Sequence, residues 1–228
     1  MGRSQTSLKV LYEDNHLLVI DKPAEVATMG AAPGATSLYD LAKQYLKTKY
    51  DKPGNVYLGI VSRLDAVVTG VVVLARTSKA ASRLSKAFSD GSVDKGYWAL
   101  ISDHPEPDRA HCRDWLRKDE RQRRVVVCPA NHPEAKPAAL SYEMIRRCRG
   151  RRALLQIKLE TGRKHQIRVQ LAHRGWPILG DRKYGSELRF PSGIALHART
   201  LRFTHPVQKI PLEFSATLPP AWDRFVAE

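Results

Sequence analysis

Hydrophobic and polar positions in the first half of the chain predict short strands and amphipathic helices. The apolar runs Leu58 to Val61 and Val71 to Ala75 are short and rich in β-branched residues, so we expect buried strands. Lys9 to Ile20 predicts a hairpin around the polar turn Glu13-Asp14-Asn15. Ser37 and Asp40 form a capping-box pattern before apolar residues at helical spacing, which predicts a helix up to about Leu46.

The second half continues the pattern with more strands. Thr77-Ser78 can cap a helix that runs to about Ser89, and Lys95 to Ile101 alternates so that Tyr97, Ala99 and Ile101 share one face of a strand. Further extended segments are Leu140 to Ile145 with Ala153 to Glu160, as a hairpin, and Ala195 to Ala198 and Leu201 to Phe203, as closing strands; Pro219 to Glu228 predicts a terminal helix or tail. Strands outnumber helices and no G-x-G-x-x-G follows the first strand. We therefore expect an α+β fold with a mixed, mainly antiparallel sheet, flanking helices and a central basic cleft.

One acid interrupts the predicted buried strands. Asp65 lies between the two apolar runs, in or beside the core, where an unpaired carboxylate costs several kcal/mol. It should therefore have a specific partner. A structural salt bridge to Arg63 or another arginine is as good an interpretation of this stretch as a functional one.

A second polar stretch offers that partner. Thr161 can cap a short helix that Gly175 would close, and on this helix His165, Arg168 and Ala172 share one face. Arg168 could then point inward at an acid. The stretches around Asp65 and Arg168 thus fit as two halves of one site.

Composition favours a folded protein with a polyanionic partner. The 228 residues are 43% hydrophobic, and 38 Lys and Arg against 23 Asp and Glu give a net charge of +15. Five arginines crowd the stretch Arg146 to Arg152, which we expect at a hairpin tip in contact with nucleic-acid phosphates. No apolar run approaches the roughly 20 residues of a membrane helix, so we expect a cytoplasmic protein.

Two features of the charged middle segment have competing interpretations. Arg109, Arg113, Arg117 and Arg121 recur every fourth residue, which would form a basic stripe on a helix, but such like charges repel and we favour an extended segment over 104–137. Cys112, Cys128 and Cys148 fit free thiols. His111 and His132 near two of them suggest zinc, but without a C-x-x-C spacing we expect no metal.

Four motifs in order give the chain a specific resemblance. They are Ser62 to Gly70, Lys95 to Ala99, Thr161 to Leu171 and Gly175 to Gly185. The chain resembles the RluA-like family of RNA pseudouridine synthases, whose signatures are H-R-L-D-x-x-T-S-G, K-x-Y-x-A, T-G-R-x-H-Q-I-R-V-x-L and G-x-P-I-x-G-D-x-x-Y-G. The resemblance covers nearly the whole chain and implies one catalytic domain over 1–228, with no room for an S4-type RNA-binding domain before it.

The resemblance also implies an activity and its residues. It implies the conversion of uridine to pseudouridine in rRNA or tRNA, without a cofactor, by a monomer. Asp65 would be the catalytic carboxylate, Arg168 would hold it ionised, and Tyr97 would stack on the target base and could help to remove the C5 proton. Arg63 would enter the space that the flipped base leaves. The remaining substrate-binding positions are Thr69, Arg163, Lys164, His165 and Gln166; for His165 a structural role is as plausible.

The chain departs from the family pattern beside the acid. Ser62 replaces the usual His, Val68-Thr69-Gly70 replaces Thr-Ser-Gly, and Ala66-Val67 stands where a polar pair is common. We expect the chemistry to survive and the loop's contacts to RNA to change. Two other functions compete: a non-catalytic RNA-binding or ribosome-assembly protein on the same fold, and a base-excising glycosylase, whose class lacks the T-G-R-x-H-Q-I-R signature.

Overall fold

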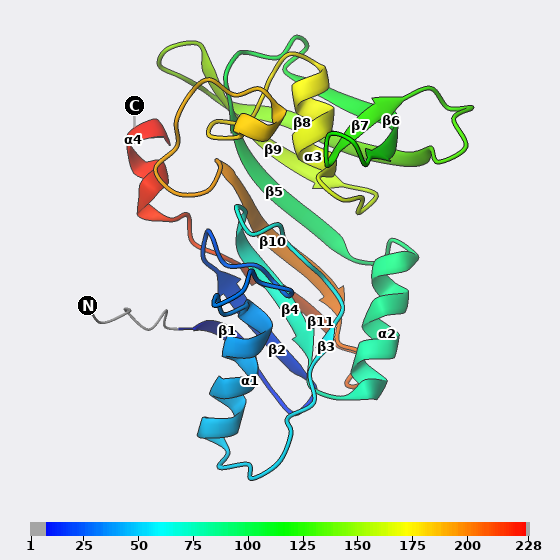
Figure 1. Cartoon of the computed structure of the whole chain (residues 1–228), viewed down its shortest axis with the longest axis vertical. Coiled ribbons are helices and arrows are strands. Elements are labelled where there is room, and N and C mark those ends of the chain that lie inside the picture. Colours follow the sequence, from blue (N-terminus) through cyan, green and yellow to red (C-terminus); the bar gives the residue numbers. More distant parts are fainter. Residues whose placement is uncertain (1–7, 227–228) are drawn as a thin grey trace.

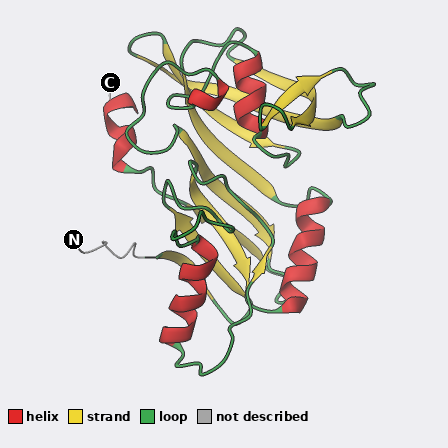
Figure 2. Ribbon diagram, viewed as in Figure 1, coloured by secondary structure: helices red, strands yellow, loops and turns green. Residues whose placement is uncertain are grey.

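A mixed β-sheet of eleven strands is the central element of the fold (Figure 1, Figure 2). The computed structural model describes residues 8–226. The strands are β1 (Lys9–Glu13), β2 (Leu17–Lys22), β3 (Gly59–Ile60), β4 (Thr69–Ala75), β5 (Asp94–Ile101), β6 (Arg109–Asp119), β7 (Arg124–Cys128), β8 (Lys136–Cys148), β9 (Arg152–Leu159), β10 (Leu196–Thr204) and β11 (Pro211–Ser215). Their order is β1-β2-β4-β10-β5-β9-β8-β6-β7, with β3 beside β4 and β11 beside β10.

The sheet is mainly antiparallel, as the sequence predicted. Within the described residues only β4 and β10 pair in parallel, through His197 with Thr69 and Ala198 with Gly70. At this junction Gly70 has φ +112°, and a Cβ on it would lie 2.2 Å from the Ala198 carbonyl oxygen. Only glycine can adopt this conformation and permit this approach without strain.

Helices cover both faces of the N-terminal part of the sheet. Helix α1 (Leu38–Lys49) packs against Leu18, Ile20 and Val72, while Leu84 of α2 (Ser78–Ser89) packs on the opposite face against Val71 and Val73. All seven residues of β4 are therefore buried, which explains why its sequence is a continuous apolar run rather than an alternating one. The predicted capping box of α1 and the Thr77 cap of α2 are both present.

Helix α3 (Gln166–His173) covers one face of the C-terminal part of the sheet. Ile167 and Leu171 pack with Leu140 of β8 and Ile157 of β9. Shorter helical turns follow: η1 (Arg182–Tyr184), η2 (Pro220–Trp222) and α4 (Asp223–Val226). None of the helices described in residues 8–226 is both long and apolar enough to cross a membrane.

The structure corrects three details of the sequence interpretation. Thr161 is not a helix cap: its hydroxyl bonds to Ala139 and Gln166, and α3 begins only at Gln166. The two predicted closing strands are one strand, β10, whose pairing with β5 shifts between Ala198 and Thr200. Strand β11 was not predicted, because Pro211 to Ser215 lacks a long apolar run and is ordered by pairing with β10.

Other expectations are confirmed. The segment 104–137 is extended and contains β6 and β7, and the hairpin of β8 and β9 is present, longer than predicted. The predicted tail over 219–228 forms η2 and α4, and its last two residues lie outside the described part.

Candidate active site

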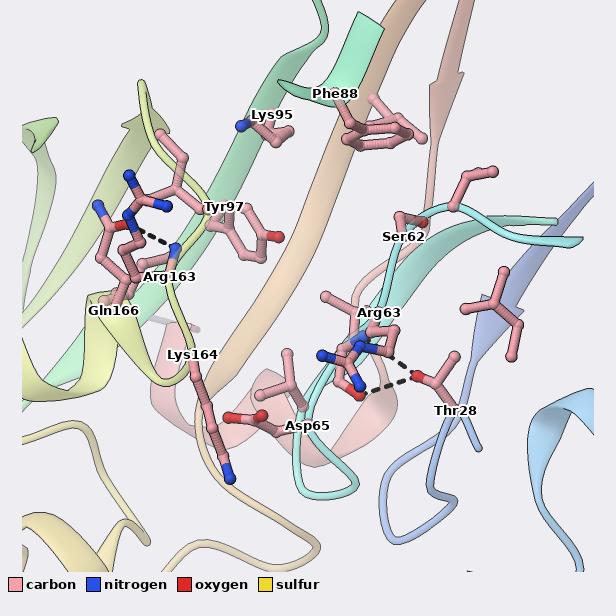
Figure 3. A pocket seen from close by; sticks show the side chains of 18 of the residues that line it. Thr28, Ser62, Arg63, Asp65, Phe88, Lys95, Tyr97, Arg163, Lys164 and Gln166 are labelled. Atoms are coloured by element: carbon pink, nitrogen blue, oxygen red, sulfur yellow. Dashed lines mark hydrogen bonds between the residues drawn. The ribbon is translucent and has the colours of Figure 1, made fainter. Parts of the chain in front are cut away.

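A pocket of about 1330 Å³ lies where several segments of the fold meet. They include the loop between β3 and β4, the end of α2, β5, and the stretch from the end of β9 into α3. Figure 3 shows Arg63, Asp65, Tyr97 and Lys164 around this space. The chain thus brings Asp65, Tyr97 and Arg168 into one cavity, as expected from their motifs.

Main-chain contacts fix the loop that carries Asp65. The Thr28 hydroxyl donates to the Leu64 carbonyl at 2.8 Å and accepts from the Leu64 amide at 3.1 Å, the two dashed bonds at Thr28 in Figure 3. Within the loop Val68 N donates to Asp65 O at 3.0 Å. Two partners from elsewhere reach the next carbonyls: Lys22 Nζ lies 3.0 Å from Ala66 O, and Ile194 N lies 3.0 Å from Val67 O.

Lys22 is an unforeseen support of this loop. Its side chain is fully buried, and its ammonium also donates to the Pro23 and Val26 carbonyls at 2.8 Å each. Burial lowers the pKa of Lys22 to about 7, against the opposing effect of the Asp65 charge. Its place in the D-K-P stretch at the end of β2 was the available signal, to which the sequence interpretation gave no role in the site.

Arg168 joins two carboxylates. Its Nη1 donates to Asp65 Oδ2 at 2.8 Å, while Nε and Nη2 donate to the two oxygens of Asp181 at 2.7 and 2.9 Å. The side chain is 6% exposed, against 27% for Asp65 and 1% for Asp181. Burial alone would lower the pKa of the Arg168 guanidinium, but the hydrogen bonds and charges of Asp181 and then Asp65 raise it above its ordinary value. Asp65 is thus a partly exposed carboxylate bound to a buried guanidinium that Asp181 holds in place. The partner of Asp65 is Arg168 rather than Arg63.

His165 stands beside this pair as a neutral ring. It occupies the N-cap position of α3 with a left-handed φ of 54° and makes no side-chain capping bond. Burial lowers its pKa to about 4, which the Asp65 charge opposes and Arg168 reinforces. At 3.7 Å from Asp65 Oδ2, its Nε2 therefore does not form an ion pair at neutral pH. Tyr184 Oη lies 2.8 Å from Nδ1 and accepts from Val125 N, so it links the His165 ring to β7.

Tyr97 projects from β5 into the pocket (Figure 3). Burial, and then the charge of Asp65, raises the pKa of its phenol well above the ordinary value of 10.0. The ring is therefore a neutral phenol at physiological pH.

The other predicted substrate-binding positions differ in what they can reach. Arg63, Arg163 and Lys164 line the pocket with exposed side chains, and Arg163 donates from Nε to Pro137 O. Gln166 also lines the pocket but is 3% exposed, and its amide closes the 161–166 turn through Thr161, Arg163 N and Ala139 O. Thr69 lies elsewhere: it is buried, and its hydroxyl is 2.8 Å from His197 Nδ1, because strand β4 begins there and turns the side chain into the core.

The unusual residues around Asp65 are held mainly by the protein itself. The Ser62 hydroxyl lies 3.3 Å from Val73 O and 3.4 Å from Val73 N, so it ties the loop to β4. Val68 is 3% exposed and belongs to the core. The change to valine at residue 68 therefore affects packing in the core. Of the positions that depart from the family pattern, Ser62 and Ala66 line the pocket with side chains that are not buried.

The arginine-rich tip lies away from the pocket. Of its residues, Arg147 pairs with Asp108 and Arg151 with Asp103, while Arg146 donates to Val226 O and Arg152 to Arg149 O. All of these side chains but that of Arg152 are exposed. Contact of the tip with RNA stays a prediction.

The described residues contain no group of three or more His, Cys, Asp or Glu side chains that could hold a metal ion. Among the four residues considered for zinc, His111 instead pairs with Glu160 at 2.6 Å.

Sequence comparison places these residues in a known context. The profile of the family described as RNA pseudouridylate synthase matches residues 16–173. Ribosomal large subunit pseudouridine synthase D of Xanthomonas campestris pv. campestris is 35% identical over 243 residues, which cover 96% of this chain and 69% of that protein. An uncharacterized RNA pseudouridine synthase of Chlorobaculum parvum is 33% identical over 93% of this chain and 71% of its own length. The family match includes Asp65, Tyr97 and Arg168.

Solved structures show the same fold. Human RNA Pseudouridylate Synthase Domain Containing 4 superimposes with a TM-score of 0.78 at 24% identity, over 95% of this chain and 92% of that one. Human RNA Pseudouridylate Synthase Domain Containing 1 gives 0.76 at 23% identity, over 96% and 86%.

Proposed function

Because the chain belongs to the RluA-like family of RNA pseudouridine synthases and is an isomerase acting on RNA, we propose that Asp65 is its catalytic carboxylate. We further propose that its substrate is ribosomal RNA of the large subunit, since relatives at about a third identity are named for that subunit. A cytoplasmic place of action belongs to this proposal. The membership sets aside a purely RNA-binding role and a glycosylase.

The contact between Arg168 and Asp65 is the observation that carries the proposal. The guanidinium holds Oδ2 at 2.8 Å, and no hydrogen bond to Oδ1 is made by any residue of the described chain. The side chain is 27% exposed, at the wall of an open pocket. A carboxylate that is held in place and turns a free oxygen to a cavity suits attack on a substrate better than a purely structural salt bridge does.

The reaction needs only such an oxygen and a target uracil that is held in place. The N1–C1′ bond of uridine breaks, the uracil turns, C5 bonds to C1′, and the proton lost from C5 is balanced by one gained at N1. Oδ1 of Asp65 can attack C1′ or C6 or take the C2′ proton, and each route uses the same atom. No oxidant or reductant is consumed.

Tyr97 would hold the base through its ring. The raised pKa of its phenol supports a neutral stacking surface rather than a phenolate base. The exposed cations Arg63, Arg163 and Lys164 at the pocket wall would bind RNA, with Arg63 entering the stack that the flipped uridine leaves.

Tritium release from 5-tritiated uridine in rRNA tests the proposal. Wild-type protein should release label, and Asp65→Asn should release none while it binds RNA with nearly unchanged affinity, because the amide keeps the size of the side chain. Arg202→Gln, on an exposed ion pair with Glu213 outside the pocket, is the control for general damage. Equal release by wild type and Asp65→Asn would show that this carboxylate is not the catalyst; mapping of pseudouridines in cells with and without the gene identifies the RNA.

A further inference from the structure

Lys95 is a nearly buried cation without an internal counter-charge. Its side chain leaves β5 between Leu159 and Leu201, its register partners on β9 and β10, and is 8% exposed. Within residues 8–226 its ammonium makes neither a hydrogen bond nor an ion pair with another side chain or carbonyl. The neighbouring acid, Asp94, is paired with Lys158 at 3.1 Å.

The environment of Lys95 is costly for a charge. Burial lowers the pKa of its ammonium, and the charge of Asp94 offsets this only in part. Lys22, the other buried lysine of this fold, has three carbonyl partners. The fold therefore gives the Lys22 ammonium its partners, whereas the Lys95 ammonium sits at the end of a mostly buried side chain, reaches the pocket and has no partner in the described protein. A bound anion can supply that partner.

The free ammonium opens into the catalytic pocket. Lys95 lines that pocket, and Figure 3 shows its side chain beside Tyr97, on the side of the loop that carries Arg163 and Lys164. Gly162 faces it: a Cβ on this glycine would lie 4.0 Å from Nζ. The exposed cations of residues 163 and 164 continue the positive wall from there.

We propose that Lys95 binds a backbone phosphate of the RNA strand that carries the target nucleotide into the pocket. This rests on the proposed function, because the substrate is then a polyanion with one phosphate per nucleotide. A phosphate oxygen offers the ammonium the charged acceptor that the protein withholds. The contact positions the strand while Tyr97 and Asp65 act on the base and sugar.

Lys95→Met tests the proposal through affinity and stability together. Methionine keeps the length of the side chain without its charge, so RNA binding should weaken roughly ten- to a hundredfold. The slope of log K against log salt should fall by about 0.7, the value for one single-stranded phosphate. The melting temperature should stay the same or rise, because the substitution removes a partly desolvated charge that has no partner in the protein. Lys95→Arg keeps a cation and should keep the wild-type slope.

A scan with single neutral methylphosphonates locates the contact. Each oligonucleotide carries one methylphosphonate near the target uridine, and at one position it should weaken binding to wild type but not to Lys95→Met. The control is Lys158→Met, from an exposed lysine on the neighbouring strand, which should show the wild-type profile. A wild-type slope and profile in Lys95→Met, or a lowered melting temperature with unchanged affinity, would overturn the proposal. Binding is measured without turnover, so this test and that of Asp65 can fail separately.

Discussion

Replacing Asp181 by asparagine should show whether the fixed position of the Arg168 guanidinium matters for catalysis, because Asp181 itself does not contact the substrate. Asp181 is 1% exposed and accepts two hydrogen bonds from Arg168, so it cannot reach RNA. In Asp181→Asn the amide oxygen can accept one of these bonds, while its NH₂ group faces the other guanidinium donor. One charge-assisted bond is lost, and Arg168 keeps Asp65 as its only anionic partner.

The magnitude follows from this count. Breaking a buried ion pair costs about 3–5 kcal/mol, and the bond that asparagine retains and the remaining partner favour the lower end, about 3 kcal/mol. For a chain of this size, each kcal/mol lowers the melting temperature by about 2–4 °C, which gives a loss of roughly 6–12 °C. Because Arg168 is no longer held from behind, kcat should fall roughly a hundredfold while RNA affinity changes little.

Urea denaturation and tritium release measure the two effects. Asp114→Asn is the matched control: Asp114 forms a part-buried pair with Arg174 at 2.8 Å and does not line the pocket, so stability should fall but kcat should not. A wild-type kcat in Asp181→Asn would refute the positioning role. A stability loss below about 1 kcal/mol would refute the reasoning from buried charge.

Two further predictions concern the supports of the Asp65 loop. Burial lowers the pKa of Lys22 in the folded state from 10.5 to about 7, so the unfolded state binds more protons between these pH values. The contribution of Lys22 to the free energy of unfolding of the wild type should therefore rise with pH from 7 to 10.5. Lys22→Met should lack this component in urea titrations at pH 7.5 and 9.5, and parallel slopes in both proteins would contradict the assignment. Gly70→Ala should destabilise the protein by more than Gly91→Ala, since both glycines have positive φ but only a Cβ at residue 70 meets the Ala198 backbone. Similar melting temperatures for the two variants would mean that the backbone around Gly70 yields.

Local patterns predicted most of the fold. The caps at Ser37 and Thr77, the hairpins and the alternation of β5 depend on neighbouring residues, so the sequence alone indicated them correctly. The start of α3 and the single strand β10 could not be predicted in this way. Gln166 begins the helix because its amide closes a turn onto Ala139, 27 residues away, and β10 is continuous because β5 and β11 pair along it.

The sequence predicted those parts of the site that lie in the family motifs. The meeting of Asp65 with Arg168 was expected from the two halves of the site, and its geometry agrees. Asp181, Tyr184 and Lys95 were present in the quoted motifs, and Lys22 lies just after the predicted hairpin, but none of these residues received a role. Their importance lies in burial and in partners distant along the chain, such as Asp181 behind Arg168, and no local pattern reveals these. Thr69 was misplaced for the same reason, since its partner His197 is 128 residues away.

Main-chain atoms of the loop around Asp65 make many of the contacts that hold its shape. The hydrogen bonds to Thr28, Lys22 and Ile194 all use an amide or carbonyl of residues 64–67. A different side chain at residue 66 therefore leaves these hydrogen bonds intact. Homologues with dissimilar loops can hold the carboxylate at one place and still prefer different RNAs, so divergence here is a poor guide to whether the reaction has been retained.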